Sequence, residues 1–233
     1  LKVRIIGMGG SILGSKAIYD FLNIKNRKRI IFIDNLKKRM IEKENGKNIL
    51  NLIISKSGNT LETFSNVNIL LKKNQKNLFL TENTDNSLRK LANQLKCEVI
   101  DHNNFIGGRY SVLSEVGMLP AIIMGLSEKK FKQFNSLIKN KYFIESLINS
   151  VGNSLHYIKK KKFNSIILNY DEDSDNLFKW YQQLVAESLG KKGGGLFPIV
   201  STMPKDNHSL MQLYLDGPKN NFFTFFNVNE KKT

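Results

Sequence analysis

Short apolar segments alternate with amphipathic helical segments through the first hundred residues, and this alternation limits the fold more than any other feature. The segments typical of strands are 3–6, 29–33, 50–54, 77–80 and 97–100, and those typical of helices are 11–22, 36–44, 60–73 and 87–95. Strands separated by helices pair in parallel, and the connecting helices cover both faces of the sheet. We therefore expect an α/β fold, a doubly wound parallel sheet in an αβα sandwich.

The second half begins with a helical stretch, residues 112–160, and then returns to strand–helix alternation. We expect strands at 165–168, 196–200 and 222–226 and helices at 175–189 and 206–215. These patterns divide the chain into a first sheet domain at 1–125, a helical connector at 126–160 and a partial second sheet domain at 161–233. The second unit looks incomplete, because a lone three-stranded sheet would leave an apolar edge and face uncovered.

The formal net charge of +16 is a reason to consider a nucleic-acid partner. The lysines are spread along the chain, often beside Asn and Ile, and do not form one patch. We therefore expect no nucleic-acid partner. No uncharged apolar run reaches the ~18 residues that a membrane helix needs, so no membrane association is expected either.

Cys97 is the only cysteine, which excludes an intramolecular disulfide and fits a reducing, cytoplasmic setting. The histidines, His102, His156 and His208, stand far apart without the spacing of metal ligands. The sequence therefore predicts no metal site.

The segment Ser55–Thr63 carries the most specific functional signal. It follows the apolar run 50–54 and precedes a helical pattern. Free N–H groups at a helix start, short hydroxyls and the Lys56 cation together suit a phosphate. The alternative is a plain N-cap turn, because Ser, Thr and Asn favour such positions anyway. The following helix is expected to bury a face with Leu61, Phe64, Val67, Asn68 and Leu71.

A glycine-rich loop, Gly7–Ser15, follows the first strand. Its glycines let the backbone approach a ligand closely, and Ser11 can cap the helix or donate to the ligand. A dinucleotide-binding loop would need a glycine where Ile12 stands. Asp34 does end the second strand, as that class of site requires, so the dinucleotide interpretation remains a weaker alternative.

Arg109 lies between two glycines and a helical segment, in Gly107–Ser111. An arginine in that position can stabilise an enediolate or hold a phosphate. The alternative is a structural arginine that bridges loops.

Gln183 and Glu187 are spaced i, i+4 and share a helix face. Because a glycine-rich loop follows, Glu187 is a candidate general base beside a loop-lined pocket, although an exposed glutamate without a role is the alternative. His208 stands near the start of the last expected helix, where Asp206 is a candidate N-cap. A lone histidine there is otherwise a surface residue, and His102 and His156 are read as surface or hydrogen-bonded structural histidines.

Taken in chain order, these motifs resemble the phosphoglucose isomerase family, which is built from two sugar-isomerase (SIS) domains. The matching segments are Gly7–Gly14, Ser55–Thr63, Gly107–Ser114, Ala186–Lys191, Asn207–Ser209 with Gln212–Tyr214, and Asp216–Pro218. They span nearly the whole chain, and motifs in family order are more specific than any one alone.

The resemblance implies an enzyme of glycolysis and gluconeogenesis that interconverts glucose 6-phosphate and fructose 6-phosphate through a cis-enediolate, without a cofactor. Glu187 would move the proton between C1 and C2, Arg109 would stabilise the enediolate and His208 would assist ring opening. Gln183 would position the sugar. The implied phosphate contacts are Gly10, Ser11, Ser55, Lys56, Ser57 and Thr60. It also implies a homodimer, in which the histidine reaches the site of the neighbouring subunit.

The chain departs from the family pattern at both ends. The family's N-terminal extension has no counterpart here, and neither does its C-terminal lysine that takes part in ring opening. Lys231 and Lys232 lie in a polar tail and are not assigned that role. The alternatives are a dual phosphoglucose/phosphomannose isomerase and a noncatalytic SIS-type module that binds a phosphosugar.

Overall fold

The computed structural model describes residues 2–24, 29–36, 48–72, 74–131 and 133–229. The chain forms two compact units, Leu1–Leu126 and Ser127–Thr233. Each unit has its own parallel sheet, and each is described by itself.

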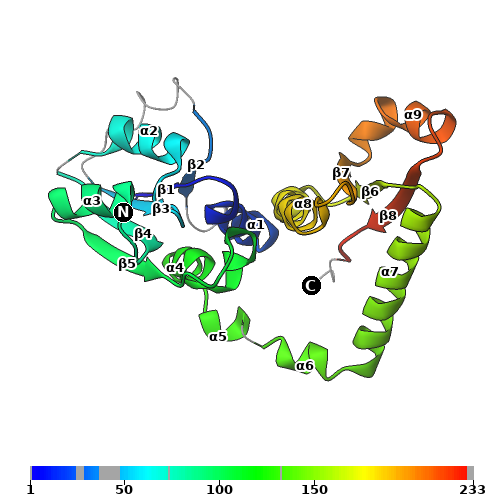
Figure 1. Cartoon of the computed structure of the whole chain (residues 1–233), viewed down its shortest axis with the longest axis horizontal. Coiled ribbons are helices and arrows are strands. Elements are labelled where there is room, and N and C mark those ends of the chain that lie inside the picture. The colour runs from blue at the N-terminus through cyan, green and yellow to red at the C-terminus, as the bar shows by residue number, and fades with distance from the viewer. Residues whose placement is uncertain (1, 25–28, 37–47, 73, 132, 230–233) are drawn as a thin grey trace. The chain divides into compact units, whose positions relative to one another are not determined.

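The first unit is a parallel sheet with helices on both faces (Figure 1). Its strands are β1 Lys2–Ile6, β2 Ile30–Ile33, β3 Ile49–Ile54, β4 Lys76–Glu82 and β5 Glu98–His102. Its helices are α1 Leu13–Phe21, α2 Leu61–Leu70, α3 Ser87–Gln94 and α4 Glu115–Ile123. The strand order is β2-β1-β3-β4-β5, and every pairing is parallel. The expected doubly wound sheet is confirmed.

The strand sequences are apolar because both faces of this sheet are buried. Ile6, Ile53 and Phe79 are neighbours on one face and have no exposed surface. Val67 of α2 and Leu88 of α3 pack against that face, whereas α1 and α4 contact each other on the other side. Burial on both faces favours the near-continuous Ile and Leu runs of parallel strands.

The strand order fixes where a ligand can bind. The chain leaves β1 toward β2 on one side and returns to β3 on the other side of β1. Ligands of such sheets bind at this switch point, beyond the carboxyl ends of the strands. The loops that begin at Gly7 and Ser55 follow β1 and β3, so both lie there.

The expected buried face of α2 is wrong in part. Leu61 is 76% exposed, whereas Thr63, Asn66 and Leu70 are buried together with Val67. Asn66 is buried because its amide donates to the backbone oxygen of Asn35 at 3.3 Å, which satisfies the polar group. The helix expected at 36–44 lies almost wholly outside the described residues.

The second unit begins with helices and continues as a smaller sheet. The helices are α5 Glu128–Phe131, α6 Asn135–Ile138 and α7 Lys141–Lys159, and none of their described residues is buried. The sheet has the order β7-β6-β8, all parallel, with β6 Asn164–Asn169, β7 Phe197–Thr202 and β8 Asn221–Phe226. Helix α8, Asp175–Leu189, connects β6 to β7. Phe225 is 72% exposed and Phe197 68%, in agreement with the expected uncovered apolar surface.

The expected helix at 206–215 is divided into two pieces. A 3-10 turn, Lys205–His208, precedes the short helix α9, Met211–Asp216. Asp206 does not cap a helix, and that prediction is wrong. Its carboxylate accepts instead from the Thr202 backbone N–H at 2.9 Å and the Ser201 hydroxyl at 3.0 Å, so it closes the turn after β7.

No helix in the described part of the chain is long and apolar enough to cross a membrane.

Candidate functional site

The glycine loop after β1 and the arginine loop before α4 are in direct contact. A Cβ atom on Gly10 would lie 2.2 Å from the Gly108 carbonyl oxygen, so only glycine allows this approach. The Ser111 hydroxyl lies 3.1 Å from the Gly10 carbonyl oxygen and 2.6 Å from that of Gly108. Two segments about a hundred positions apart therefore form one surface, with Arg109 beside Gly10.

Arg109 lies in a 3-10 turn, Gly108–Leu113, where the guanidinium stacks 4.5 Å from the ring centroid of Tyr110. Stacking on an aromatic face holds the guanidinium without removing its charge. A permanent cation is thereby held next to the glycine loop at the carboxyl edge of the sheet. The site can accordingly stabilise a negative charge that develops on a substrate.

The Ser55–Thr60 turn presents two hydroxyls side by side. The Ser55 hydroxyl is buried, and its oxygen lies 3.0 Å from that of Thr60. Thr60 occupies the N-cap position of α2 but makes no side-chain capping hydrogen bond. The N-cap alternative therefore does not account for its hydroxyl, which pairs instead with the Ser55 hydroxyl at the start of the helix.

The neighbouring helix α3 fixes the shape of this turn. Gly58 has a φ of +64°, and a Cβ there would lie 1.9 Å from the Asn86 side-chain oxygen. Asn59 accepts a hydrogen bond from the Ser87 N–H at 3.0 Å, at the first residue of α3. Glycine and asparagine at 58 and 59 thus follow from this packing.

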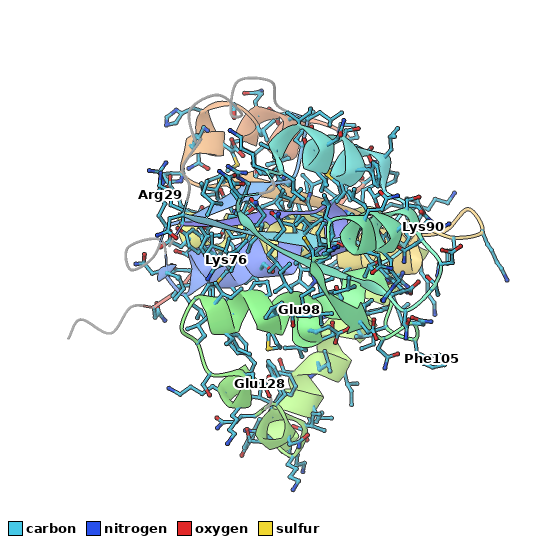
Figure 2. All side chains as sticks on the ribbon, turned by 90° about the vertical axis from the view of Figure 1, so that its left-hand side faces the viewer. Arg29, Lys76, Lys90, Glu98, Phe105 and Glu128 are labelled. Carbon is cyan, nitrogen blue, oxygen red and sulfur yellow. The ribbon has the colours of Figure 1, made fainter. Side chains whose placement is uncertain are left out.

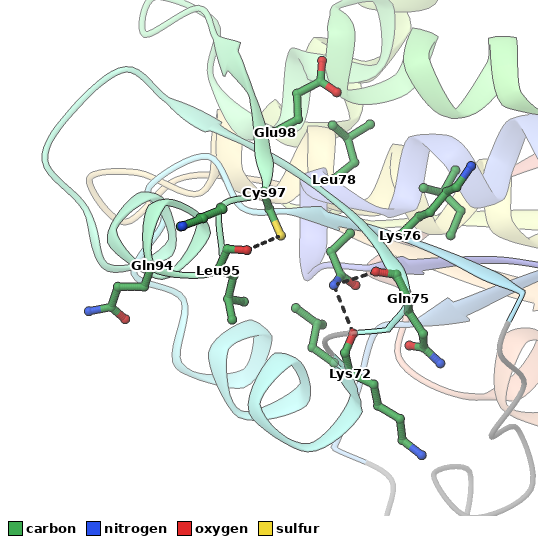
Figure 3. A pocket seen from close by; sticks show the side chains of 12 residues that line it. Lys72, Gln75, Lys76, Leu78, Gln94, Leu95, Cys97 and Glu98 are labelled. Atoms are coloured by element: carbon green, nitrogen blue, oxygen red, sulfur yellow. Dashed lines mark hydrogen bonds between the residues drawn. The ribbon is translucent and has the colours of Figure 1, made fainter.

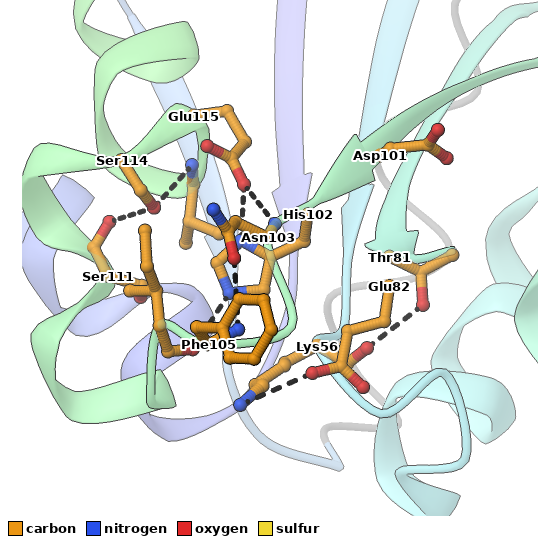
Figure 4. Close-up of polar contacts among 12 residues, drawn as sticks. Lys56, Thr81, Glu82, Asp101, His102, Asn103, Phe105, Ser111, Ser114 and Glu115 are labelled. Carbon is orange, nitrogen blue, oxygen red and sulfur yellow. Dashed lines mark hydrogen bonds and ion pairs between the residues drawn. The ribbon is translucent and has the colours of Figure 1, made fainter. Parts of the chain in front are cut away.

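Lys56 forms an ion pair with a carboxylate of β4. Its ammonium lies 3.3 Å from Glu82 Oε1, and both side chains are partly buried (Figure 4). The Lys56 carbonyl oxygen also accepts from the Thr81 hydroxyl at 3.1 Å. A phosphate at Lys56 would therefore share the ammonium with Glu82.

The remaining predicted phosphate contacts lie in the same two loops. Ser57 is exposed, and its hydroxyl accepts from the Asn59 N–H at 3.3 Å. Ser11 ends a 3-10 turn, Gly9–Ser11, and is partly exposed. Asp34 accepts from the Lys16 ammonium at 2.7 Å, an interaction that competes with the ribose contact of the dinucleotide alternative.

In the second unit, Gln183 and Glu187 lie together on α8, as their spacing predicts. The Gln183 amide donates to Glu187 Oε1 at 2.7 Å, and the carboxylate side of the pair is exposed. The Gln183 oxygen is buried, with no hydrogen-bond partner among the described residues. A cavity of about 530 Å³ lies at this end of α8, and its lining includes Ala186 and the glycine-rich segment 190–195.

Glu187 and His208 lie at opposite ends of β7. The C-terminal half of α8 is next to the start of β7, where Gln182 donates to the Pro198 carbonyl oxygen at 2.8 Å. His208 follows the end of β7 in the turn closed by Asp206, and it is exposed. A six-residue strand is about 20 Å long, so these two side chains do not meet within one unit.

A second cavity, about 800 Å³ in volume, lies at the other edge of the first sheet (Figure 3). Its walls include Leu50, Lys76 and Glu98, near the starts of β3, β4 and β5. Cys97 also lines it, and burial raises the pKa of the thiol, partly offset by a hydrogen bond with Asn77. This cavity is separated from the predicted site by the length of the strands.

The sequence did not predict two interactions at the carboxyl edge, the ion pair Lys56–Glu82 and the pair His102–Glu115. Their signal was weak, because an acid at the end of a strand is common on protein surfaces. His102 is buried and hydrogen-bonded, as its structural interpretation expected. Among the described residues, no three His, Cys, Asp or Glu side chains gather as metal ligands would.

The parallel sheet and its switch-point loops define an α/β protein of the SIS type. The model of the phosphoglucose isomerase family matches residues 2–195. The chain belongs to the phosphoglucose isomerase family.

Curated relatives agree with this assignment. The chain is 34% identical over 243 residues to "Glucose-6-phosphate isomerase" of Methanocaldococcus jannaschii, covering 96% of this chain and 59% of that protein. It is 34% identical over 250 residues to the protein of the same name from Campylobacter jejuni, covering 98% of this chain and 61% of that protein. The chain thus spans about 60% of the length of these relatives.

Solved structures share the fold. A crystal structure of a hypothetical protein from Thermus thermophilus superposes with a TM-score of 0.79 at 25% identity, covering 99% of this chain and 62% of that one. A tagatose-6-phosphate ketose/aldose isomerase from Escherichia coli superposes with a TM-score of 0.65 at 14% identity, covering 91% of this chain and 59% of that one.

Proposed function

We propose that the protein is an isomerase that interconverts glucose 6-phosphate and fructose 6-phosphate through a cis-enediolate. The observation that carries this proposal is the contact of Gly10 with Gly108, which holds the Arg109 loop against the glycine loop at the switch point. Family membership and the names of the relatives support the substrate class. An aldose–ketose isomerisation needs a phosphate anchor, one base and an oxyanion stabiliser.

In this proposal the first unit anchors the phosphate. The hydroxyls of Ser55, Ser57 and Thr60 donate to its oxygens, and Lys56 supplies a positive charge. Gly10 and Ser11 bring backbone N–H groups and a hydroxyl to the same anion. Contacts remote from C1 and C2 provide binding energy that orients the reacting carbons.

Glu187 is the proposed base. It removes the C2 proton of the open-chain aldose, the C1–C2 double bond forms, and the carbonyl oxygen at C1 becomes an oxyanion near Arg109. The same carboxyl group returns the proton to C1, and movement of the hydroxyl proton from O2 to O1 completes the ketose. Gln183 orients the carboxylate and the sugar, and His208 assists ring opening.

We further propose a cytoplasmic homodimer with shared active sites and a small-molecule substrate, without nucleic acid or membrane as partner. The separation of Glu187 from His208 along β7 supports sharing, because a histidine from a second copy can supply what one unit does not bring together. The proposed division is a phosphate-binding SIS domain at 1–125, a connector at 126–160 and part of a second SIS domain at 161–233.

A coupled assay of the purified protein with fructose 6-phosphate tests the activity, and mannose 6-phosphate in a parallel assay tests the dual-specificity alternative. Glu187→Gln should retain binding and lower kcat by about 10²–10⁴-fold, because the base is lost while the anchor remains. Glu172→Gln, an exposed acid before α8, is the matched control and should keep wild-type kcat. An unchanged rate for Glu187→Gln refutes the base, and binding without turnover by the wild type favours the phosphosugar-binding module.

A further inference from the structure

A buried histidine ties down the loop that leads from β5 to Arg109. His102, the last residue of β5, is 2% exposed. Its Nδ1 lies 2.5 Å from Glu115 Oε1, and its Nε2 lies 3.2 Å from the Ile106 carbonyl oxygen. One ring thus joins the strand, the middle of the following loop and the first turn of α4 (Figure 4).

Glu115 also holds the start of the same loop. Its Oε1 also accepts from the Asn103 N–H at 2.9 Å. Burial raises the pKa of the Glu115 carboxyl, but backbone N–H donors of Glu115 and Asn103 and the contact with His102 outweigh it, so the pKa is lowered. The carboxylate therefore stays charged and contacts two consecutive residues, His102 and Asn103, where the loop begins.

The loop has little apolar packing at its tip. Phe105 is 97% exposed and projects away from the first unit (Figure 2). Its backbone N–H is bonded to the Asn103 side chain at 3.0 Å, a contact within the loop itself. Polar contacts, and not apolar burial, therefore hold this segment.

We propose that His102 and Glu115 are positioning residues, which hold residues 103–108 so that Arg109 keeps its orientation beside Gly10. Both act through Arg109 and touch no substrate. We call the contacts of His102 with Glu115 and Ile106 the clamp. Ile106 directly precedes the Gly107–Arg109 segment, which packs on the glycine loop. This inference rests on the proposed role of Arg109, since it assigns a support to that residue.

Two variants separate the two contacts of the ring. The side-chain amide of Asn reaches about as far as Nδ1 and can donate to the Glu115 carboxylate, so His102→Asn keeps the contact with Glu115 and loses the contact with Ile106. The side-chain amide of Gln reaches about as far as Nε2 and can donate to the Ile106 carbonyl oxygen, so His102→Gln keeps the contact with Ile106 and loses the contact with Glu115. If the clamp positions Arg109, each variant lowers kcat by about 10- to 100-fold, because small displacements of a reacting group are costly, and changes KM less than about 3-fold.

The matched control is Asn51→Ala. Asn51 is fully buried and bonded to Arg4, Gln75 and Asn77, away from the loop. Removal of the Asn51 side chain should lower the stability of the protein as the His102 variants do, but it should leave kcat unchanged. A fall in kcat for Asn51→Ala as large as for His102→Gln would overturn the positioning role.

A double variant tests the route through Arg109. Combined with Arg109→Lys, His102→Gln should lower kcat little further than Arg109→Lys alone, because effects of residues that act as a unit are not additive. Fully additive losses would refute action through Arg109.

Hydrogen exchange tests the clamp without any turnover. In His102→Gln the amides of residues 103–111 should exchange at least about 10-fold faster, while those of β3 stay unchanged. Unchanged exchange at 103–111 refutes the clamp. A wild type that converts no hexose 6-phosphate, with the exchange change intact, refutes the proposed function and leaves the clamp standing.

Discussion

The hydroxyl of Thr60 lies 3.0 Å from that of Ser55 and caps no helix, although Thr60 stands at the N-cap position of α2. A hydroxyl at an N-cap ordinarily accepts from the helix N–H groups. Here the two hydroxyls are paired with each other at the carboxyl end of β3, where the free N–H groups of α2 also point. This arrangement suits an anion better than it suits the helix alone.

Removal of either hydroxyl should weaken phosphate binding. Thr60→Val keeps the branched shape, and Ser55→Ala removes only an oxygen. A hydrogen bond to a charged group contributes about 1.5–3 kcal/mol, so KM for fructose 6-phosphate should rise about 10- to 100-fold with kcat changed less. Steady-state kinetics over a wide substrate range measures both constants.

Ser154→Ala is the control for these variants. Its hydroxyl donates to the Ser150 carbonyl oxygen within α7, away from the predicted phosphate contacts in sequence, so KM should not change. A wild-type KM in both Thr60→Val and Ser55→Ala would remove the turn from the phosphate site.

In the proposed site, Glu82 would compete with the substrate phosphate for Lys56. Glu82→Gln removes a negative charge 3.3 Å from the Lys56 ammonium and should tighten phosphate binding by up to about 5-fold, since partly exposed ion pairs contribute roughly 1 kcal/mol or less. Asp85→Asn makes the same charge change at the exposed pair with Lys90 and should have a smaller effect. Calorimetric titration with inorganic phosphate measures the difference, and weaker binding in Glu82→Gln would show that Glu82 instead orients Lys56 for the anion.

Gly58→Ala should destabilise the protein more than its backbone angle alone explains. Gly58 and Gly125 both have positive φ, at +64° and +89°, but of these two only Gly58 would bring an added Cβ against other atoms, those of Asn86 and Thr81. Gly125→Ala should cost about 1 kcal/mol of unfolding free energy from φ strain, and Gly58→Ala should cost more. Urea denaturation of both variants tests this, and equal losses would argue against the clash.

Glu115 makes stability depend on pH in the acid range. Its pKa is lowered in the folded protein, so its contribution is present above the unfolded pKa and is lost as pH falls through the folded value. Wild type should therefore lose its stability advantage over Glu115→Gln as pH falls below about 4, which is near the ordinary pKa of a glutamate side chain. Urea unfolding of both proteins across pH 3–7 gives the comparison, and a constant difference would contradict the shift.

Local sequence patterns predicted the fold and the loops, because helices, strands and turns depend largely on residues that are close in sequence. The helix at Asp175–Leu189 and the i, i+4 pair Gln183–Glu187 are both as expected, since helical spacing alone sets them. The prediction of the buried face of α2 was wrong in part, because Asn66 donates to the carbonyl oxygen of Asn35, which is distant in sequence, and is therefore buried.

Contacts between distant segments could not be predicted in the same way. The approach of Gly10 to Gly108 and the pair Lys56–Glu82 depend on which strands are neighbours. The clash of an added Cβ at position 58 with Asn86 likewise depends on the packing of a distant segment. The sequence therefore predicts which residues form the site, whereas the structure shows which neighbouring groups contact them.

A mixing experiment tests whether two copies of the chain share each active site. Glu187→Gln and His208→Gln are each expected to be impaired alone. In a homodimer whose sites take Glu187 from one subunit and His208 from the other, a mixed dimer contains one site with both native residues. Random exchange of equal amounts then restores about a quarter of wild-type activity, since half of the dimers are mixed and each has one native site. The two variants are mixed after partial unfolding and refolding, and each is refolded alone as the control. If each site takes both residues from one subunit, every site in the mixture carries one substitution and activity stays at the level of the single variants.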